Sequence, residues 1–330
     1  MLKNKQIFLK ETPQDKLSNA HFEIRTSEIP SPADGQILIE TLYISIDAAN
    51  RAWMQGRTYR DQILPGNLMA GFALGKVIET KNNNFNVGDM VEGDLGWQNY
   101  SLKSANEIVK ARIISSPNLH MSVLGITGRT AYFGMQLANL KNKDTVVVSA
   151  AAGAVGNVAG QIAKIKGCRV IGITGSKEKS QWLIQDLGFD GVVNYKNGNW
   201  LKNLKELCPN KIDVYFDNVG GDIFESIMFG MNNYGRVICC GALSQYDRAP
   251  PKSGPRGIPG IIVTKRLSLR GFIVMDFDDQ KEEANKQLQE WIDNKKILVA
   301  EDIVEGLENT PSALIGLLNG ENKGKRLVKL

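Results

Sequence analysis

A turn of small residues constrains the fold of this chain more than any other feature. The segment Ser149-Ala150-Ala151-Ala152-Gly153-Ala154-Val155-Gly156 follows a short apolar strand predicted at 145–150 and opens a helix predicted at 155–166. Free N–H groups at a helix N-terminus, with no bulky side chain in the way, can bind a pyrophosphate. Ala151 stands at the first glycine position of the GxGxxG fingerprint, so the match is imperfect. The position between strand and helix is what favours a dinucleotide site.

Strands and helices alternate on both sides of this turn. The predicted strands lie at 145–150, 169–174, 191–194, 212–217, 235–240 and 267–274, and the predicted helices at 122–140, 155–166, 176–187 and 222–231. Ser122 and Ser176 are predicted to cap their helices, and Gly167 and Gly188 follow the ends of the helices predicted at 155–166 and 176–187. Alternating βα units of this length predict a parallel sheet with helices on both faces.

The first third of the chain has a different pattern, which predicts a barrel-like β domain. Short strands are expected at 36–46, 74–80, 90–92, 98–102 and 108–114, with Pro, Gly and Asn between them. At the other end, helices are expected at 280–294 and 311–319 and a closing strand at 325–330. The segment 245–260 is rich in Pro, Gly and charge, so we expect a long surface loop, either a connector or a lid over a ligand.

Composition excludes several classes of protein. A length of 330 residues favours two domains, and 42% hydrophobic with 23% charged residues is enough for packed cores. The net charge is +5, but Lys and Arg are scattered and form no run typical of nucleic-acid binding. No apolar run reaches the ~20 residues that span a membrane. Cys168, Cys208, Cys239 and Cys240 have no disulfide-framework spacing, and the start lacks a signal peptide, so we expect a cytoplasmic protein.

The end of the strand after the glycine turn decides between NAD and NADP. An NAD site usually has Asp or Glu there, which binds the ribose hydroxyl. This chain has Ile173-Thr174-Gly175-Ser176-Lys177-Glu178-Lys179, with no carboxylate at the tip. Ser176 and Lys179 are able to bind a 2′-phosphate instead, although exposed lysines are common on helices. We therefore predict NADPH/NADP+ as the cofactor.

The sequence offers no convincing metal site. His21 and His120 are the two histidines, and the cysteines lack the spacing of metal ligands. We expect both histidines to be ordinary surface residues. Chemistry that requires a bound Lewis acid is therefore disfavoured.

Several motifs together resemble one family, the zinc-independent medium-chain dehydrogenases/reductases. The similarity is to the branch that contains prostaglandin and leukotriene reductases, plant alkenal double-bond reductases and bacterial curcumin reductase. The matching stretches span nearly the whole chain in the family's order: Tyr43–Asp47, Gly128–Gly134, Ala150–Gly156, Phe216–Gly221, Cys240–Tyr246 and Asn322–Lys325. FDNVGG together with CGALSQY is more specific than the glycine turn alone. Gly71-Phe72-Ala73 stands where zinc-binding relatives have Gly-His-Glu.

The resemblance implies an α/β fold that combines a GroES-like β-barrel domain with an inserted, doubly wound Rossmann domain of six parallel strands. The implied bounds are 1–122 for the GroES-like catalytic domain, 123–293 for the Rossmann NADP-binding domain and 294–330 for a C-terminal return to the catalytic domain. It also implies a homodimer, formed by edge pairing of the strand at 267–274 in two subunits.

The same resemblance implies the cofactor contacts. They are Gly153, Ala154, Val155 and Gly156 at the pyrophosphate, Ser176, Lys179 and Tyr195 at the adenosine phosphate, and Asn218, Cys240, Gly241, Ala242, Leu243, Ser244, Gln245, Tyr246, Phe272, Ile273, Val274 and Asn322 along the remainder. Without the resemblance, we would interpret Phe272 as an aromatic residue of the hydrophobic core.

The implied activity is NADPH-dependent reduction of the carbon–carbon double bond of α,β-unsaturated ketones or aldehydes, by hydride transfer to the β-carbon. The carbonyl oxygen then gains negative charge and needs a hydrogen-bond donor. Tyr246 is our candidate catalytic residue, as that donor or as the source of a proton. The alternative is that Tyr246 only packs against the cofactor or substrate.

The segment Asp47-Ala48-Ala49-Asn50-Arg51 departs from the related Asp-Pro-Tyr-Met-Arg pattern, since Ala49 replaces a tyrosine that contacts substrate in some relatives. This puts a prostaglandin-type substrate in doubt. Tyr43, Arg57 and Tyr59 are candidates for the pocket mouth, although surface or packing roles suit each of them. Arg51 either pairs with Asp47, four residues away, or is exposed.

Two other functions compete with enone reduction. One is quinone reduction, because pocket chemistry overlaps within the superfamily. The other is NADPH binding without catalysis, in a structural or RNA-associated protein, which the intact turn and Tyr246 disfavour. No basic stripe with interleaved aromatic residues supports RNA binding. We expect small enones or enals as partners, and neither nucleic acid nor membrane.

Overall fold

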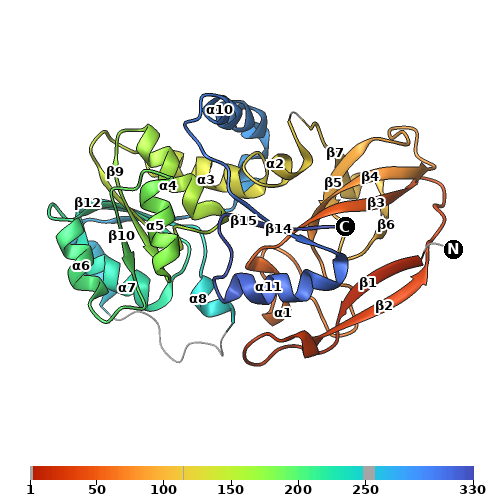
Figure 1. Cartoon of the computed structure of the whole chain (residues 1–330), viewed down its shortest axis with the longest axis horizontal. Coiled ribbons are helices and arrows are strands. Elements are labelled where there is room, and N and C mark those ends of the chain that lie inside the picture. Colours follow the sequence, from red (N-terminus) through yellow and green to blue (C-terminus); the bar gives the residue numbers. More distant parts are fainter. Residues whose placement is uncertain (1–2, 114, 248–256) are drawn as a thin grey trace.

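The computed structural model describes residues 3–113, 115–247 and 257–330. Two large sheets organise the chain, one on each side of the molecule (Figure 1), and β1 (Lys3–Leu9) and β2 (Phe22–Glu28) form a separate two-stranded sheet. The N-terminal strands form one side and the nucleotide-binding-type βα units form the other, and the C-terminal segment returns between them. In the described ranges, no helix is long and apolar enough to cross a membrane.

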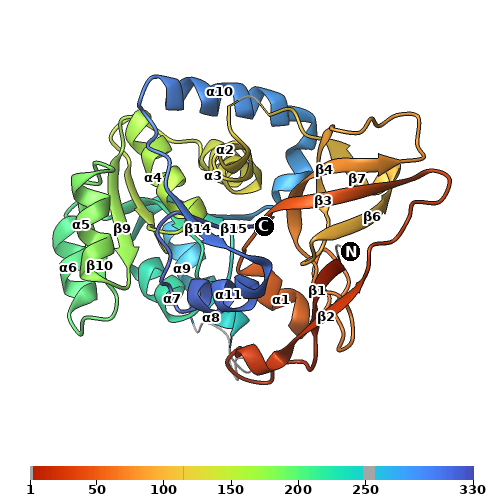
Figure 2. The same ribbon diagram turned by 45° about the vertical axis from the view of Figure 1, so that its right-hand side comes forward.

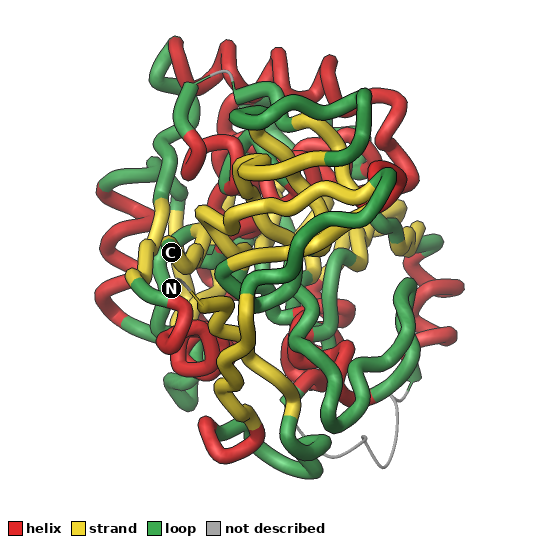
Figure 3. Tube along the Cα trace, turned by 90° about the vertical axis from the view of Figure 1, so that its right-hand side faces the viewer, coloured by secondary structure: helices red, strands yellow, loops and turns green. Residues whose placement is uncertain are grey.

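The N-terminal part is a GroES-like domain built on a seven-stranded sheet. The order along this sheet is β14-β15-β3-β4-β5-β7, and β6 pairs with β3. Its strands are β3 (Gln36–Ser45), β4 (Phe72–Thr80), β5 (Met90–Asp94), β6 (Tyr100–Ser104), β7 (Ile108–Lys110), β14 (Glu301–Glu305) and β15 (Lys325–Lys329). From its own side, strands occupy the front of the molecule and helices lie at the margins (Figure 3).

The second part is a Rossmann domain with a six-stranded, all-parallel sheet in the order β10-β9-β8-β11-β12-β13. Its strands are β8 (Thr145–Val148), β9 (Arg169–Thr174), β10 (Gly191–Asn194), β11 (Ile212–Asp217), β12 (Met231–Cys239) and β13 (Ser268–Gly271). In the central strands β8, β9 and β11, successive residues are buried on opposite faces of the sheet, which is why these strands are mostly apolar.

Helices cover both faces of the parallel sheet, as predicted. One face packs against α3 (Ile126–Leu137), α4 (Ala154–Ile165), α5 (Lys177–Gln185) and α10 (Lys281–Asp293). The other packs against α6 (Trp200–Leu207), α7 (Gly221–Gly230) and α9 (Ile258–Lys265). Gly167 and Gly188 lie in the left-handed region beyond the ends of α4 and α5, with φ of +77° and +68°.

The single helix predicted at 122–140, with Ser122 as its cap, is wrong. Two helices occupy this region, α2 (Pro117–Met121) and α3, with Gly125 as the N-cap of α3. The chain turns too closely between them for a continuous helix, since a Cβ on Gly125 would lie 2.6 Å from the His120 carbonyl oxygen. The Ser122 hydroxyl hydrogen-bonds to Glu301 and to the Leu119 carbonyl oxygen, so it does not cap α3.

The prediction of one irregular loop at 245–260 is wrong at both ends. The short helix α8 (Leu243–Tyr246) reaches into the segment, and α9 begins at Ile258. Pro259 suits the first turn of α9 because that turn needs no donor from its N–H group. The prediction for 248–256 lies outside the described residues.

Other strand predictions differ mainly at their bounds. β6 begins two residues later than expected, and β7 ends at Lys110, while the predicted end at 114 lies outside the described residues. The antiparallel pair β1 (Lys3–Leu9) and β2 (Phe22–Glu28) was not predicted, nor were α1 (Ala49–Gln55), α6 and β14.

The C-terminal segment joins the two sheets. After α11 (Thr310–Leu318), the chain passes the glycine turn, where the Gly324 N–H donates to the Ala152 carbonyl oxygen at 2.9 Å. It then enters β15, which pairs with β3 and β14. Figure 2 shows β14, β15 and α11 lying between the two parts of the molecule.

Candidate functional site

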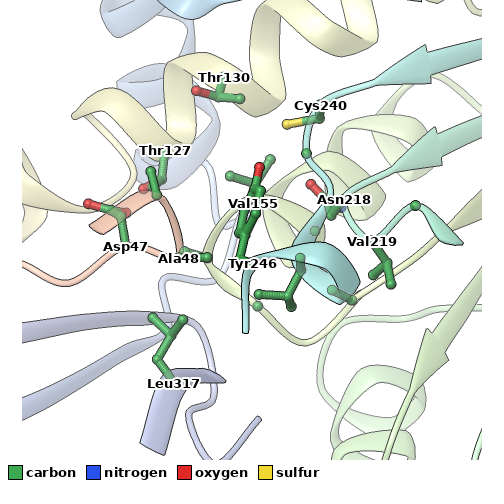
Figure 4. A pocket seen from close by; sticks show the side chains of 18 of the residues that line it. Asp47, Ala48, Thr127, Thr130, Val155, Asn218, Val219, Cys240, Tyr246 and Leu317 are labelled. Carbon is green, nitrogen blue, oxygen red and sulfur yellow. The ribbon is translucent and has the colours of Figure 1, made fainter. Parts of the chain in front are cut away.

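A cavity of about 1750 Å³ lies between the two sheets and is lined by residues of both. This exceeds the ~300–1,000 Å³ typical of small-ligand pockets, so a dinucleotide and a second molecule fit together. Figure 4 shows Thr127 and Thr130 on one wall, Asn218, Val219 and Cys240 on another, and Tyr246 and Val155 in the view between them.

The glycine turn forms the floor of the cavity at the start of α4. Gly153 is the N-cap, and the first intrahelical bond runs from the Asn157 N–H to the Gly153 carbonyl oxygen. The N–H groups of residues 154–156 precede that bond and are available to an anion. A Cβ on Gly156 would lie 2.4 Å from the Ala150 carbonyl oxygen, so the close packing of the turn requires glycine there.

Three predicted residues meet at the end of the cavity next to β9. The Ser176 hydroxyl caps α5 by accepting the Lys179 N–H at 3.2 Å. Lys179 Nζ donates to the Gly320 carbonyl oxygen at 2.6 Å, and burial and then the charge of Arg326 lower the pKa of Lys179. Tyr195, which follows β10, lines the same end. Lys196 also lines this end and was missed, although it adjoins a predicted residue.

A buried carboxylate fixes the turn that carries Asn218. Asp217 is 2% exposed and accepts hydrogen bonds from the Ser149 and Tyr215 hydroxyls and the N–H groups of Val219 and Gly220. This explains the FDNVGG motif: the carboxylate holds the turn, and Gly220, at φ +67°, permits its reversal. The sequence reasoning quoted Asp217 in the motif and gave it no role.

The segment after β12 forms the wall opposite α3. The Tyr246 hydroxyl accepts the Ala242 N–H at 3.1 Å, and the Ser244 hydroxyl donates to the Val219 carbonyl oxygen at 2.7 Å. Cys240 lines the cavity; burial, then the charge of Asp217, raise the pKa of its thiol to about 12. Gly241 and residues 243–246 line the cavity, whereas Ala242 does not.

The remaining predicted contacts also lie at the cavity. Residues 272–274 line it next to Phe277, and Asn322 lines it from the C-terminal segment. Asn322 is 6% exposed, and its side-chain amide donates to the Gly324 carbonyl oxygen at 2.8 Å. The structure thus brings together the predicted cofactor contacts except Ala242.

The four candidates for the substrate pocket separate into two pairs. Ala49 and Tyr59 line the cavity. Tyr43 packs instead against Leu74 and neighbouring apolar residues, and the Arg57 side chain is 84% exposed and pairs with Asp61. Tyr43 and Arg57 are therefore away from the cavity wall, in the packing and surface roles that the sequence also allowed.

Both expectations for Arg51 are wrong. Arg51 is fully buried, and its Nε lies 2.9 Å from Asp247 Oδ1, at the end of α8. Asp47 pairs with Lys325 at 2.6 Å instead. The reason is burial: α1 packs its inner face into the core of the N-terminal part, and Arg51 lies on that face.

The two histidines differ in their environments. His21 contacts Ser18 near the surface. The His120 side chain is 11% exposed, and its Nε2 lies 2.7 Å from Glu92, so the expectation of an ordinary surface residue is wrong for His120. Across the described ranges, no group of three or more His, Cys, Asp or Glu side chains is arranged to hold a metal ion.

The wall formed by α3 was missed by the sequence reasoning. It contributes Ile126, Thr127, Arg129, Thr130 and Phe133. The segment Gly128–Gly134 had been noted as a motif, and its spacing on one helical face was the available signal.

Comparisons with known proteins agree with this architecture. Residues 5–111 match the family described as the N-terminal domain of oxidoreductase, and residues 154–292 match the zinc-binding dehydrogenase family. Prostaglandin reductase 1 of Bos taurus is 40% identical over 319 residues, 94% of this chain and 94% of that protein. NADPH-dependent curcumin reductase of Escherichia coli is 34% identical over 335 residues, 99% of this chain and 97% of that protein.

A solved structure is also similar over its whole length. The crystal structure of CurA from Vibrio vulnificus in complex with NADPH has a TM-score of 0.94 and 36% identity, and covers 98% of both chains. The chain described here therefore belongs to the medium-chain dehydrogenase/reductase superfamily, in the branch of the prostaglandin, curcumin and alkenal reductases.

Proposed function

We propose that this chain is an NADPH-dependent oxidoreductase acting on CH–CH donors, which reduces the carbon–carbon double bond of α,β-unsaturated ketones or aldehydes. One observation carries the proposal: a single cavity runs from Ser176 and Lys179, past the N-terminus of α4, to Tyr246. Cofactor site and candidate proton donor therefore open into the same space.

The residues present fit NADPH. The free N–H groups of residues 154–156 suit the pyrophosphate, and the Gly153 turn leaves room for its close approach. Ser176 and Lys179 supply a hydroxyl and a cation for a 2′-phosphate. No carboxylate follows β9 before Ser176 to repel that phosphate. The names of relatives support the same cofactor, since the curcumin reductase is NADPH-dependent and CurA was solved with NADPH.

When bound, NADPH supplies a hydride. The chain's own residues then have to stabilise the negative charge that develops on the substrate's carbonyl oxygen. The Tyr246 hydroxyl is suited to this because it accepts its hydrogen bond from the Ala242 N–H, which leaves its own proton free to be donated. We assign Tyr246 as the donor to the carbonyl oxygen.

Part of the cavity wall is aromatic. Phe133 stacks on Phe277 at 4.6 Å between ring centroids, and Phe277 meets Phe272 edge-on at 6.4 Å. All three rings line the cavity. An apolar conjugated carbonyl compound suits this surface better than a polyhydroxylated one.

A screen of NADPH oxidation by absorbance tests the proposal, with enals, enones, quinones and alcohols as substrates. We expect turnover of enones and enals to exceed that of quinones and alcohols. Faster turnover of a simple quinone than of 3-nonen-2-one would favour a quinone reductase. NADPH binding without turnover across the panel would favour a non-catalytic binding protein.

Tyr246→Phe tests the catalytic assignment. Loss of a donor to a developing oxyanion typically costs a factor of about 10² to 10³ in turnover. Tyr234→Phe is the matched control, because Tyr234 is 70% exposed and does not line the cavity. Enone turnover by Tyr246→Phe within a factor of about two of the parent would remove Tyr246 from the chemistry.

A further inference from the structure

The segment 322–325 of the C-terminal return is fixed on the glycine turn. Asn322 lines the cavity, and its side-chain amide donates to the Gly324 carbonyl oxygen at 2.8 Å. The Gly324 N–H in turn donates to the Ala152 carbonyl oxygen at 2.9 Å. Gly324 has a φ of +69°, and a Cβ on it would clash with the Ala300 carbonyl oxygen, so this position requires glycine. The segment therefore lies directly against the turn that suits the cofactor's pyrophosphate.

Lys325 extends this connection to the N-terminal part of the molecule. Its side chain is 3% exposed, and its Nζ donates to the Ser45 hydroxyl at 2.7 Å, the Ile46 carbonyl oxygen at 3.2 Å and Asp47 Oδ1 at 2.6 Å. These acceptors use all three donors of an ammonium group. Lys325 does not line the cavity itself, so any effect on the site passes through the residues that it holds.

The three acceptors lie where β3 ends and the cavity wall begins. The pairing of β3 with β15 ends at Ser45, which is opposite Leu327, and the Ile46 N–H makes one more backbone bond to β15. Residues 46–49 line the cavity and lead into α1. Strand pairing thus stops at the start of this wall, and the ammonium group of Lys325 continues the contact with β15 along it.

Hydride transfer depends on how the two sides of the cavity are placed relative to each other. The nicotinamide ring and the carbon that accepts the hydride have to be held about 3–3.5 Å apart, and a misplacement of about 1 Å can cost roughly 10²-fold in rate. Asp47 and Ala48 lie on the opposite side of the view from Val219 (Figure 4). A contact that joins the N-terminal wall to the glycine turn therefore bears on the alignment of cofactor and substrate.

We propose that Lys325 is a positioning residue, which fixes the wall at residues 46–49 relative to the glycine turn and so aligns the substrate with the cofactor. The inference rests on the proposed function and deepens it, because it assigns a role in the reaction to a residue outside the cavity. Lys325 acts through Asp47 and the Ile46 carbonyl group, and Gly324 joins it to the turn.

Lys325→Met tests this role, because methionine keeps an unbranched side chain and removes the ammonium group. The Asp47 side chain is 30% exposed and keeps its contact with the Ser45 hydroxyl, so water can solvate the carboxylate in the variant. Lys329→Met is the matched control. Lys329 lies on the same strand, but its side chain is 46% exposed and pairs with Glu305 at 3.4 Å.

The quantity measured is kcat/KM for 3-nonen-2-one per NADPH-binding site, with the sites counted by fluorescence titration. Unfolded protein lowers the number of sites but not the activity of each, so a merely structural role would leave this value unchanged. We expect a fall of about ten- to a hundredfold in Lys325→Met, with an unchanged Kd for NADPH, and parent values in Lys329→Met. A value per site equal to that of the parent would overturn the proposal. An equal weakening of NADPH binding would also overturn it, since that would indicate damage to the turn.

Ser45→Ala decides the question if Lys325→Met does not fold. It removes one of the three acceptors of the ammonium group, and Ser45 does not line the cavity. We expect a smaller fall in kcat/KM per site, again with an unchanged Kd for NADPH. Activity per site equal to that of the parent would reject the role of Lys325.

Failure of the enone chemistry is distinguished by hydrogen–deuterium exchange with and without NADP+. If the parent reduces no enone, the proposed function fails, and exchange still tests the contact between the two sides. Binding of NADP+ should slow exchange at 45–50 and at 150–157 in the parent, and at 150–157 alone in Lys325→Met. Equal slowing at 45–50 in the two proteins, or no slowing there in the parent, would contradict the role of Lys325.

Discussion

The ion pair between Arg51 and Asp247 links the two parts of the molecule beside the candidate catalytic residue. Arg51 is fully buried on α1, and Asp247 follows Tyr246 at the end of α8. The Arg51 Nε–Asp247 Oδ1 distance is 2.9 Å, and the same carboxylate oxygen accepts the Leu17 N–H at 2.9 Å. Arg51 also donates from Nη2 to the backbone carbonyl oxygens of Pro13 and Asp15.

Asp247→Asn removes the negative charge and keeps the shape of the side chain. Arg51 cannot lose its proton, so the variant leaves a buried guanidinium without a compensating charge. Breaking a buried ion pair in this way costs about 3–5 kcal/mol. The Asp247 side chain is 20% exposed, so water screens part of the loss. We expect the free energy of unfolding to fall by about 3 kcal/mol, the lower end of that range.

Urea denaturation measures this loss, and Asp61→Asn is the control. Asp61 is also an acid paired with an arginine, but its side chain is 94% exposed and lies 3.6 Å from Arg57. Such surface pairs contribute about 0–1 kcal/mol. Because Tyr246 adjoins Asp247, kcat for an enone should fall in Asp247→Asn as well. A stability loss no larger than that of Asp61→Asn would refute the reasoning.

Four further predictions follow from the site and the sheet edge. Lys179→Gln should raise the KM for NADPH about tenfold and leave that for NADH unchanged, and equal effects on both would contradict a phosphate contact. Because the pKa of Cys240 is about 12, iodoacetamide should label it slowly at neutral pH and faster as the pH rises towards that value; rapid labelling at neutral pH, measured by mass spectrometry, would contradict this. Gly156→Ala should destabilise the fold by about 1–3 kcal/mol and weaken NADPH binding in fluorescence titration, because its Cβ meets the Ala150 carbonyl oxygen; unchanged unfolding and binding would contradict it. The exposed edge strand β13 should pair between two subunits, and a monomeric mass by light scattering at micromolar concentration would reject the dimer.

The parallel sheet was predictable because a strand that is buried on both faces appears in the sequence as a continuous apolar run. β9, β10 and β11 have the bounds expected from the sequence, since their apolar runs end at turn residues. The turn at Gly153 was predictable for the same reason: strand, small residues and helix are consecutive in the chain. Because the turn directly follows a strand of a βα unit, it lies at the carboxyl ends of the parallel strands, where ligands bind in such sheets.

Elements that depend on distant partners were not predictable. β2 buries Phe22 and exposes its other residues, so its alternation of apolar and polar residues is absent. It forms because β1 pairs with it, from Lys3–Glu28 to Leu9–Phe22. The short helix α1 is likewise held by tertiary packing, since an isolated helix of seven residues is marginal in water.

The partners of buried charged residues were the features least predictable from local sequence. Sequence spacing paired Arg51 with Asp47, but a fully buried guanidinium needs several acceptors, and it finds them in Asp247 and two backbone carbonyls that the spacing could not reveal. Asp47 in turn forms an ion pair with Lys325, which lies 278 residues away in the sequence. The cost of desolvation therefore determines which groups pair. A buried charge is stable only where hydrogen-bonding or oppositely charged partners surround it, and these partners can be distant in the sequence.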